Sequence, residues 1–195
     1  MIYRWKEGKM KKHLLILFVL MMVIPFSAFS EEKTLVGDGF DNGGYGGPVV
    51  KFMSLSGDLA VVVGGRGGWI INHTFVIGGG GYGLASDIEI DGNDLNLDYG
   101  GFELEYIWRS DSLLHFTIHM GIGGGKVEMI DPVYVQDKFF YLEPTFNLEL
   151  NLLKWLRINT GVGYLWVDNI QGMPGLSTSD VRSVTGTILL KFGWF

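Results

Sequence analysis

Apolar and polar side chains alternate with a period of two along much of this sequence. The alternation is clearest in FFYLEPTFNLELNL, residues 139–152. One set of alternate positions there is mainly apolar: Phe140, Leu142, Pro144, Phe146, Leu148, Leu150 and Leu152. The positions between them are mainly polar: Tyr141, Glu143, Thr145, Asn147, Glu149 and Asn151. Because successive side chains of a strand point to opposite sides, the pattern predicts a β-strand with one apolar and one polar face.

The same pattern recurs in other segments, with turn residues between them. The predicted strands are 48–55, 59–71, 74–85, 99–108, 113–123, 139–152, 156–167 and 184–194. The second and third are rich in glycine and alternate less clearly. A polar, glycine-rich leader without periodicity, residues 31–47, precedes them. The sequence therefore predicts an all-β domain of eight antiparallel strands over residues 48–195.

The N-terminal segment has the order of a secretory signal peptide. Residues 1–12 are basic, residues 14–26 are wholly apolar, and the small residues of SAFS follow. We predict a signal peptide over 1–30 with cleavage after Ser30. The apolar run is shorter than the roughly 20 residues that a membrane-spanning helix needs, although a retained anchor is the alternative. Met10 begins a more ordinary signal than Met1 does, so either can be the start.

Composition narrows the classes of protein further. Without residues 1–30 the chain keeps 10 basic and 20 acidic residues, a balance that disfavours a nucleic-acid partner. The absence of cysteine excludes a disulfide scaffold, a cysteine zinc site and a thiol nucleophile. No other stretch is long and apolar enough to predict a transmembrane helix. The mature chain is therefore either soluble in an exported compartment or a transmembrane β-barrel.

Charged residues in mid-strand positions favour the transmembrane barrel. Four acids and four bases lie on the polar faces: Lys51, Arg66, Glu103, Glu105, Glu143, Glu149, Arg157 and Lys191. A balanced set suits a narrow lumen in which each buried charge needs a partner. The alternative is the solvated face of a soluble sheet.

Large aromatic residues also favour the transmembrane barrel, because they gather at strand ends on the apolar faces. They are Trp69, Tyr106, Trp108, Tyr164, Trp166 and Trp194. Amphipathic rings prefer the headgroup level of a bilayer, where they form the aromatic girdles of outer-membrane barrels. The alternative is an ordinary hydrophobic core.

These features together resemble the small outer-membrane β-barrel proteins of Gram-negative bacteria. The resemblance rests on the predicted signal, the eight alternating segments, NLELNLLKWLRINTGVGYLW (147–166) and the terminal TILLKFGWF (187–195). It implies a single eight-stranded up-and-down transmembrane barrel, monomeric, located in the outer membrane. It also implies contact with membrane lipid and lipopolysaccharide, and recognition of Phe195 by the barrel-assembly machinery. Gly193 departs from the pattern, since an apolar residue is usual two positions before the terminal Phe.

Loop lengths predict the orientation of such a barrel. The connections 71–74, 109–112 and 152–155 are short, whereas 86–96, 130–138 and 168–182 are long and polar. Outer-membrane barrels have short periplasmic turns and longer extracellular loops. We therefore expect the long loops outside the cell, and both termini in the periplasm.

Three glycine-rich motifs resemble nucleotide-binding loops but lack the required context. GIGGGK (121–126) has Val127 where a phosphate loop needs Ser or Thr. GGRGGW (64–69) and GGGGYG (78–83) lack the strand–turn–helix setting of a dinucleotide site. We expect these glycines to permit bending, close backbone approach or room for lumen side chains.

Candidate metal ligands are equally weak. His115 and His119 share one face of a predicted strand, where four residues span about 13 Å, too far for one ion. Hydrogen bonds in the lumen are the expected role of both. The acidic loop 86–96 resembles a calcium loop, but Gly92 is misplaced and the distal Glu is missing. The sequence therefore predicts no metal and no cofactor.

The predicted function is that of a non-enzymatic outer-membrane protein with a structural or envelope-interaction role. Eight strands enclose an interior that side chains just fill, so an open pore is not expected. One alternative is a lipid-modifying barrel enzyme, which needs a Ser/His/acid set at the lipid-facing rim. The strand histidines point to the lumen phase and His73 lies in a short turn, so no such set can be assembled. The other alternative is a soluble, lipocalin-like periplasmic carrier.

Overall fold

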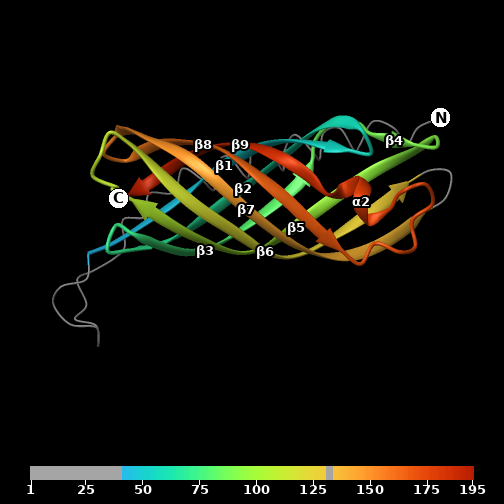
Figure 1. The fold of residues 1–195 in the computed structure, drawn as a ribbon, viewed down its shortest axis with the longest axis horizontal. Coiled ribbons are helices and arrows are strands. Elements are labelled where there is room, and N and C mark those ends of the chain that lie inside the picture. The colour runs from blue at the N-terminus through green and yellow to red at the C-terminus, as the bar shows by residue number, and fades with distance from the viewer. Residues whose placement is uncertain (1–40, 131–133) are drawn as a thin grey trace, which may run out of the picture. The chain divides into compact units, whose positions relative to one another are not determined.

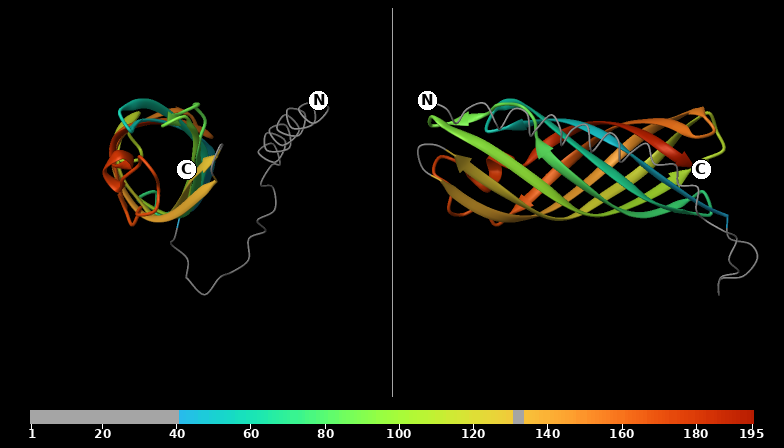
Figure 2. Two further views of the ribbon diagram at one scale, coloured as in Figure 1. Left: turned by 90° about the vertical axis from the view of Figure 1, so that its right-hand side faces the viewer. Right: turned by 180° about the vertical axis from the view of Figure 1, so that it is seen from behind.

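The computed structural model describes residues 41–130 and 134–195, which form a closed antiparallel barrel (Figure 1). Its long strands are β1 (Asn42–Leu55), β2 (Asp58–Ile71), β3 (Phe75–Leu84), β5 (Asn93–Trp108), β6 (Leu114–Ile130), β7 (Val135–Leu153), β8 (Leu156–Asp168) and β9 (Ser183–Trp194). Each pairs with its neighbours in chain order, and β1 pairs with β9 to close the ring. The end-on view of Figure 2 shows this closure. The predicted eight-stranded up-and-down barrel is confirmed.

Two short elements lie at one end of the barrel. The strand β4 (Glu89–Ile90) pairs with the start of β5, and α2 (Thr178–Val181) is one helical turn before β9. We call this the upper end. The opposite, lower end carries the turns 72–74, 109–113 and 154–155, together with the C-terminus (Figure 1). No helix in residues 41–130 and 134–195 is long and apolar enough to cross a bilayer.

Three strands run farther toward the upper end than the sequence predicted. β5 begins at Asn93 and not at 99, β6 continues to Ile130 and not to 123, and β7 begins at Val135 and not at 139. The predicted loops 86–96 and 130–138 are therefore too long. In these extensions the inward residues are apolar and the outward residues are polar, which is the reverse of the alternation lower down. The alternation predicted for the lower part of each strand therefore stopped there, and the polar residues were assigned to loops.

The first strand also starts earlier than predicted. β1 begins at Asn42, so residues 42–47, assigned from the sequence to the leader, pair with β2 and β9. Glycines in this segment carry no side chain to reveal alternation, but their backbone still forms a ladder, with Gly46 opposite both Gly67 and Phe192. The predicted signal peptide 1–30 and the leader up to residue 40 lie outside the described residues.

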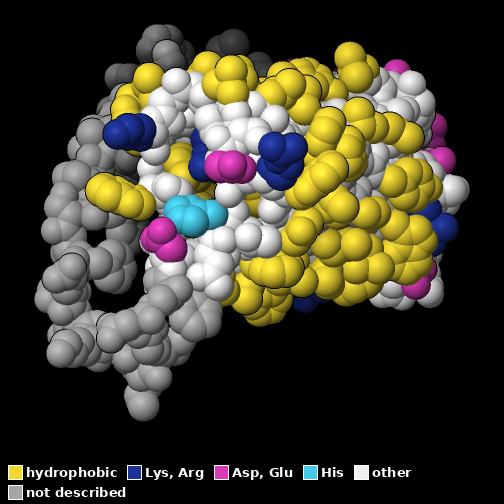
Figure 3. All heavy atoms as spheres, turned by 60° about the vertical axis from the view of Figure 1, so that its left-hand side comes forward, with side chains coloured by type: hydrophobic (Ala, Val, Ile, Leu, Met, Phe, Trp, Pro, Cys, Tyr) yellow, Lys and Arg dark blue, Asp and Glu magenta, His cyan; other side chains and the backbone are white. Residues whose placement is uncertain are grey.

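Burial follows the alternation. Over the middle of β6 and β7 the polar residues point inward and are buried, while Ile118 is 57% and Phe146 56% exposed. Hydrophobic side chains cover much of the visible outer wall, and charged side chains gather toward the two ends (Figure 3). The wall is therefore apolar outside and polar inside over its middle.

Candidate functional site

The candidate functional site is the lumen, where the structure places the eight mid-strand charges. All of them point inward and are at most 7% exposed: Lys51, Arg66, Glu103, Glu105, Glu143, Glu149, Arg157 and Lys191. Every one of them forms at least one ion pair with another member of the set. They separate into a lower group, near the lower turns, and an upper group above it.

Glu149 and Lys191 are the centre of the lower group. Lys191 pairs with Glu149, and its ammonium lies 2.7 Å from Glu105 Oε1. Arg157 Nη1 approaches Glu149 Oε1 at 3.1 Å, and Asn159 Nδ2 donates to Glu149 Oε2 at 3.0 Å. Charges removed from water are tolerated when they are paired and their remaining hydrogen-bonding capacity is used, and Glu149 meets both conditions.

The upper group contains two acid–base units. Lys51 pairs with Glu143, and Thr185 Oγ1 donates to Glu143 Oε1 at 2.9 Å. Arg66 Nη1 lies 3.9 Å from Glu103 Oε2, a longer contact than those of the lower group. Lys51 and Glu143 come from β1 and β7, and Arg66 and Glu103 come from β2 and β5, so neither pair joins neighbouring strands.

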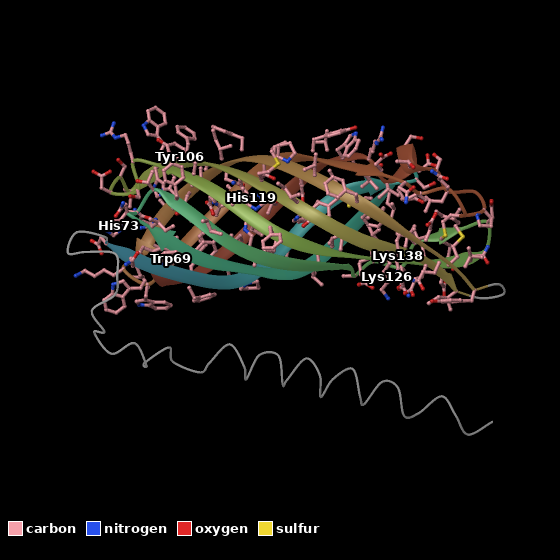
Figure 4. The ribbon with its side chains drawn as sticks, turned by 90° about the horizontal axis from the view of Figure 1, so that it is seen from below. Trp69, His73, Tyr106, His119, Lys126 and Lys138 are labelled. Atoms are coloured by element: carbon pink, nitrogen blue, oxygen red, sulfur yellow. The ribbon has the colours of Figure 1, made fainter. Side chains whose placement is uncertain are left out.

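The two strand histidines contact different carboxylates. His115 Nε2 lies 3.2 Å from Glu149 Oε1, and His119 Nε2 is hydrogen-bonded to Glu103. Both rings are buried inside the barrel, and Figure 4 shows the place of His119 within the wall. The predicted role in lumen hydrogen bonding is confirmed.

Buried tyrosines complete the network, although they were not predicted from the sequence. Tyr45 donates to Glu105 Oε2 at 2.9 Å, and Tyr82 donates to Glu103 Oε1 at 2.6 Å. The Lys51 ammonium lies 3.5 Å from the centre of the Tyr82 ring, a cation–π contact. Tyr82 could have been found from the sequence, because it occupies one of the alternate positions of β3 that face the lumen. For Tyr45 no such signal existed, because its neighbours are glycines.

An apolar layer fills the lumen above the charges. Leu55, Leu97, Val127 and Val181 are buried there, each 1% exposed or less. The connection 169–182 contributes Val181 from α2, and the backbone N–H of Ser56 donates to the Asp180 carbonyl at 2.9 Å. The lumen is therefore occupied by side chains at both levels.

Hydrogen bonds within the connection 169–182 shape its helical turn. The hydroxyl and backbone N–H of Ser177 donate to the Asp180 carboxylate at 2.6 and 2.8 Å. These bonds hold the pKa of Asp180 below its ordinary value, because they stabilise the charged carboxylate.

The nucleotide-like glycine motifs lie within strands, although the strand predicted for GIGGGK ended at residue 123. GGRGGW belongs to β2, GGGGYG to β3 and GIGGGK to β6. At Gly80 a methyl group would lie 2.6 Å from Glu103 Oε1 and 2.8 Å from the Tyr82 hydroxyl. At Gly78 it would lie 2.0 Å from the Gly67 carbonyl. Glycine thus gives room for lumen side chains at one position and close strand approach at the other.

The predicted girdle aromatics lie on the outer wall. Trp69, Tyr106, Trp108 and Trp194 surround the lower end, and each is at least 41% exposed. Figure 4 shows Trp69 and Tyr106 at that end. Nearer the upper end, Tyr164 is 43% exposed, whereas Trp166 is partly covered and contacts Phe140 edge-on. The exposed Trp155, in the β7–β8 turn, was missed because it lies between predicted strands.

The C-terminal Phe195 contacts lumen residues at the lower end. Its ring stacks on Tyr45 with 6.5 Å between centroids, and the Arg157 guanidinium lies 4.1 Å from its centre. Any recognition of Phe195 by assembly machinery would therefore have to precede this packing.

The described histidines do not form a recognisable catalytic set. Their side-chain partners are carboxylates, with Asp41 the partner of His73, and no hydroxyl is bonded to a histidine within residues 41–130 and 134–195. In the same part of the chain, no three His, Cys, Asp or Glu residues are close enough to hold a metal ion.

Solved structures that this barrel resembles include small outer-membrane barrels. Neisserial surface protein A matches at a TM-score of 0.59 and 9% identity, over 80% of this chain and 99% of its own. The N-terminal barrel domain of Pseudomonas aeruginosa OprF matches at 0.57 and 9%, over 80% and 100%. The Yersinia pestis attachment invasion locus protein Ail matches at 0.50 and 13%, over 80% and 99%. The fold is that of an eight-stranded outer-membrane barrel. No family model and no curated protein sequence matches the chain.

Proposed function

We propose that this chain is an integral outer-membrane protein whose wall faces lipid and whose lumen is filled by ion-paired side chains. The distribution of polarity supports the proposal. Glu149 and Lys191 are buried inside, whereas Phe102 is 75% exposed on the outer wall. Such a wall would be a large apolar patch in water, which soluble monomers avoid, but it matches a bilayer. A soluble carrier would need the opposite arrangement.

The proposed role is structural or in interaction at the cell envelope, without catalysis, cofactor or open pore. The paired charges and the apolar layer above them favour an occluded lumen. A lipid-modifying enzyme is less favoured because the strand histidines are engaged inside the barrel. The proposed partners are outer-membrane lipid and lipopolysaccharide, and the barrel-assembly machinery that reads Phe195 during biogenesis. The protein is proposed to be a monomer exported by its signal peptide.

Membrane retention tests this proposal. Mature protein in cell membranes is expected to resist sodium carbonate and urea washing and to be released only by detergent. It is also expected to migrate differently on gels before and after boiling, because a folded barrel resists unfolding by the gel detergent. A peripheral protein of the same cells is the control. Release by carbonate would contradict the membrane barrel.

The orientation is proposed to place the upper end outside the cell and the lower end in the periplasm, because the two longest connections, 85–92 with β4 and 169–182 with α2, lie at the upper end. The chain contains no cysteine, so single cysteines report their own location. Ser179→Cys lies in the exposed connection before β9, and Asp111→Cys in the exposed β5–β6 turn.

An impermeant maleimide is expected to label Ser179→Cys on intact cells and Asp111→Cys only after the outer membrane is permeabilised. Labelling of Asp111→Cys alone on intact cells would reverse the orientation.

A further inference from the structure

We infer that a groove on the outer wall near the upper end binds one membrane lipid, holding its acyl chain on bare backbone and its phosphate beside Lys138 and Lys126. This inference rests on the proposed membrane location and adds a specific site to it. The groove is a shallow, open depression of about 590 Å³, and its lining includes Gly81, Gly124, Asp98, Lys126 and Lys138. These residues come from β3, β5, β6 and β7, which are consecutive neighbours in the sheet.

The floor of the groove is a row of outward-facing glycines. Gly65 pairs with Gly81, Gly81 with Gly100, and Gly100 with Gly124, so neighbouring positions on β2, β3, β5 and β6 all lack a side chain. At about 4.8 Å between strands, the row extends for about 14 Å. Elsewhere the same wall carries large apolar side chains, so this row is recessed by the depth of a side chain. A flexible hydrocarbon chain fits such a recess.

Two lysines stand opposite each other on adjacent strands at the edge of this floor. Lys126 and Lys138 are directly paired across β6 and β7, and Figure 4 shows them side by side near the upper end. Lys126 Nζ lies 2.9 Å from Glu128 Oε2 and 3.6 Å from Asp98 Oδ2. No carboxylate forms an ion pair with Lys138 in the part of the chain that the structure describes. Because Lys126 is already paired with two carboxylates, Lys138 is the cation of this pair that is left to bind an anion.

A phospholipid matches both parts of the groove, the lysines and the glycine floor. Lysine binds phosphate as a point charge, and the glycine floor offers apolar contact to the attached chain. Free phosphate would use the lysines and leave the floor unused. A second barrel is a poorer occupant because two-fold packing would bring the lysine pairs of both copies together.

The test measures lipid retention by the full mature protein, purified in detergent and followed by native mass spectrometry. Dioleoyl phosphatidic acid, the diacylglycerol with the same chains, and inorganic phosphate are added in separate arms. We expect one retained phosphatidic acid per barrel, weaker retention of the diacylglycerol, and no retention of inorganic phosphate.

Gly81→Leu fills the floor without disturbing the barrel, because a methyl group at Gly81 meets no atom within 4 Å. It is expected to weaken phosphatidic acid binding roughly tenfold, the effect of about two methylene groups losing contact with the wall. Gly186→Leu is the matched control: Gly186 lies on β9, away from the groove, and is equally free of neighbours. This control should bind phosphatidic acid as the wild type does.

Lys138→Gln removes the charge. It is expected to lower phosphatidic acid binding by about threefold to tenfold, toward the diacylglycerol level, and to leave diacylglycerol binding unchanged. Lys154→Gln, in the exposed lower turn, is the matched control and should change neither.

Three results would overturn the proposal that this groove binds a lipid. One is equal phosphatidic acid binding by wild type and Gly81→Leu, and another is retention of inorganic phosphate as strongly as lipid. The third is a wild-type dimer that Gly81→Leu abolishes, since the occupant would then be a second copy. None of these affects the membrane location, which the carbonate extraction of the wild type tests separately.

Discussion

Glu149→Ala is expected to lower the free energy of unfolding by about 3–5 kcal/mol, the cost of removing one partner from a buried ion pair. Glu149 accepts from Lys191, Arg157 and Asn159, and it contacts His115. Without it, Arg157 loses its only carboxylate among the described residues, and Lys191 keeps only Glu105. Equilibrium urea unfolding of the barrel in detergent micelles measures the change.

An exposed ion pair provides the control for this variant. On the outer wall, Asp98 Oδ2 lies 3.6 Å from Lys126 Nζ, and the Asp98 side chain is 53% exposed. Exposed pairs contribute about 0–1 kcal/mol, so Asp98→Ala should change stability little. If Glu149→Ala unfolded at the same urea concentration as Asp98→Ala, the lumen would have to admit enough water to solvate its charges.

The side of the wall on which a residue lies could be predicted from the sequence. Alternation with a period of two assigns one face to each side chain, and a slip of one residue would reverse the whole strand. Alternation therefore assigns Lys51, Glu143 and Arg157 to one polar face, and the balanced charges and girdle aromatics predict that this face is the lumen. The same phase places His115 and His119 inside, although it does not identify their partners.

The pairing of these residues could not be predicted in the same way. Lys51 on β1 meets Glu143 on β7, and Lys191 on β9 meets Glu105 on β5. None of these strands are neighbours in the sheet, so the contacts depend on the tilt and stagger that close the barrel. Strand alternation carries no information about either quantity.

The sequence did not reveal the strand ends where the apolar and polar faces exchange sides. Near the upper end the inward side chains are apolar, as at Leu97 and Val127, and the outward ones are polar, as at Asp98 and Lys126. In the segment 42–47 glycine leaves almost no pattern. The glycine floor of the groove was hidden for a related reason: the motifs are visible in the sequence, but their alignment in one row requires the register of four strands.

A charge placed on the middle of the outer wall is expected to separate a membrane barrel from a soluble one. Phe146 is 56% exposed, midway along the outer face of β7 between Phe140 and Leu152. In a bilayer, Phe146→Arg is expected to cost about 2–4 kcal/mol, because arginine would lie near the midplane of the membrane. In water the same change would replace an exposed apolar ring by a solvated charge and cost little.

Leu59→Arg tests the dependence on depth that only a bilayer produces. Leu59 is 72% exposed but lies beside the β1–β2 turn, at the upper rim, where the cost should fall to about 0–1 kcal/mol. Both variants are to be unfolded reversibly from phospholipid bilayers, with urea as denaturant. A large loss at Phe146 with a small one at Leu59 is expected. Equal, small losses at both positions would mean that the wall faces water, because water imposes no gradient along the barrel axis.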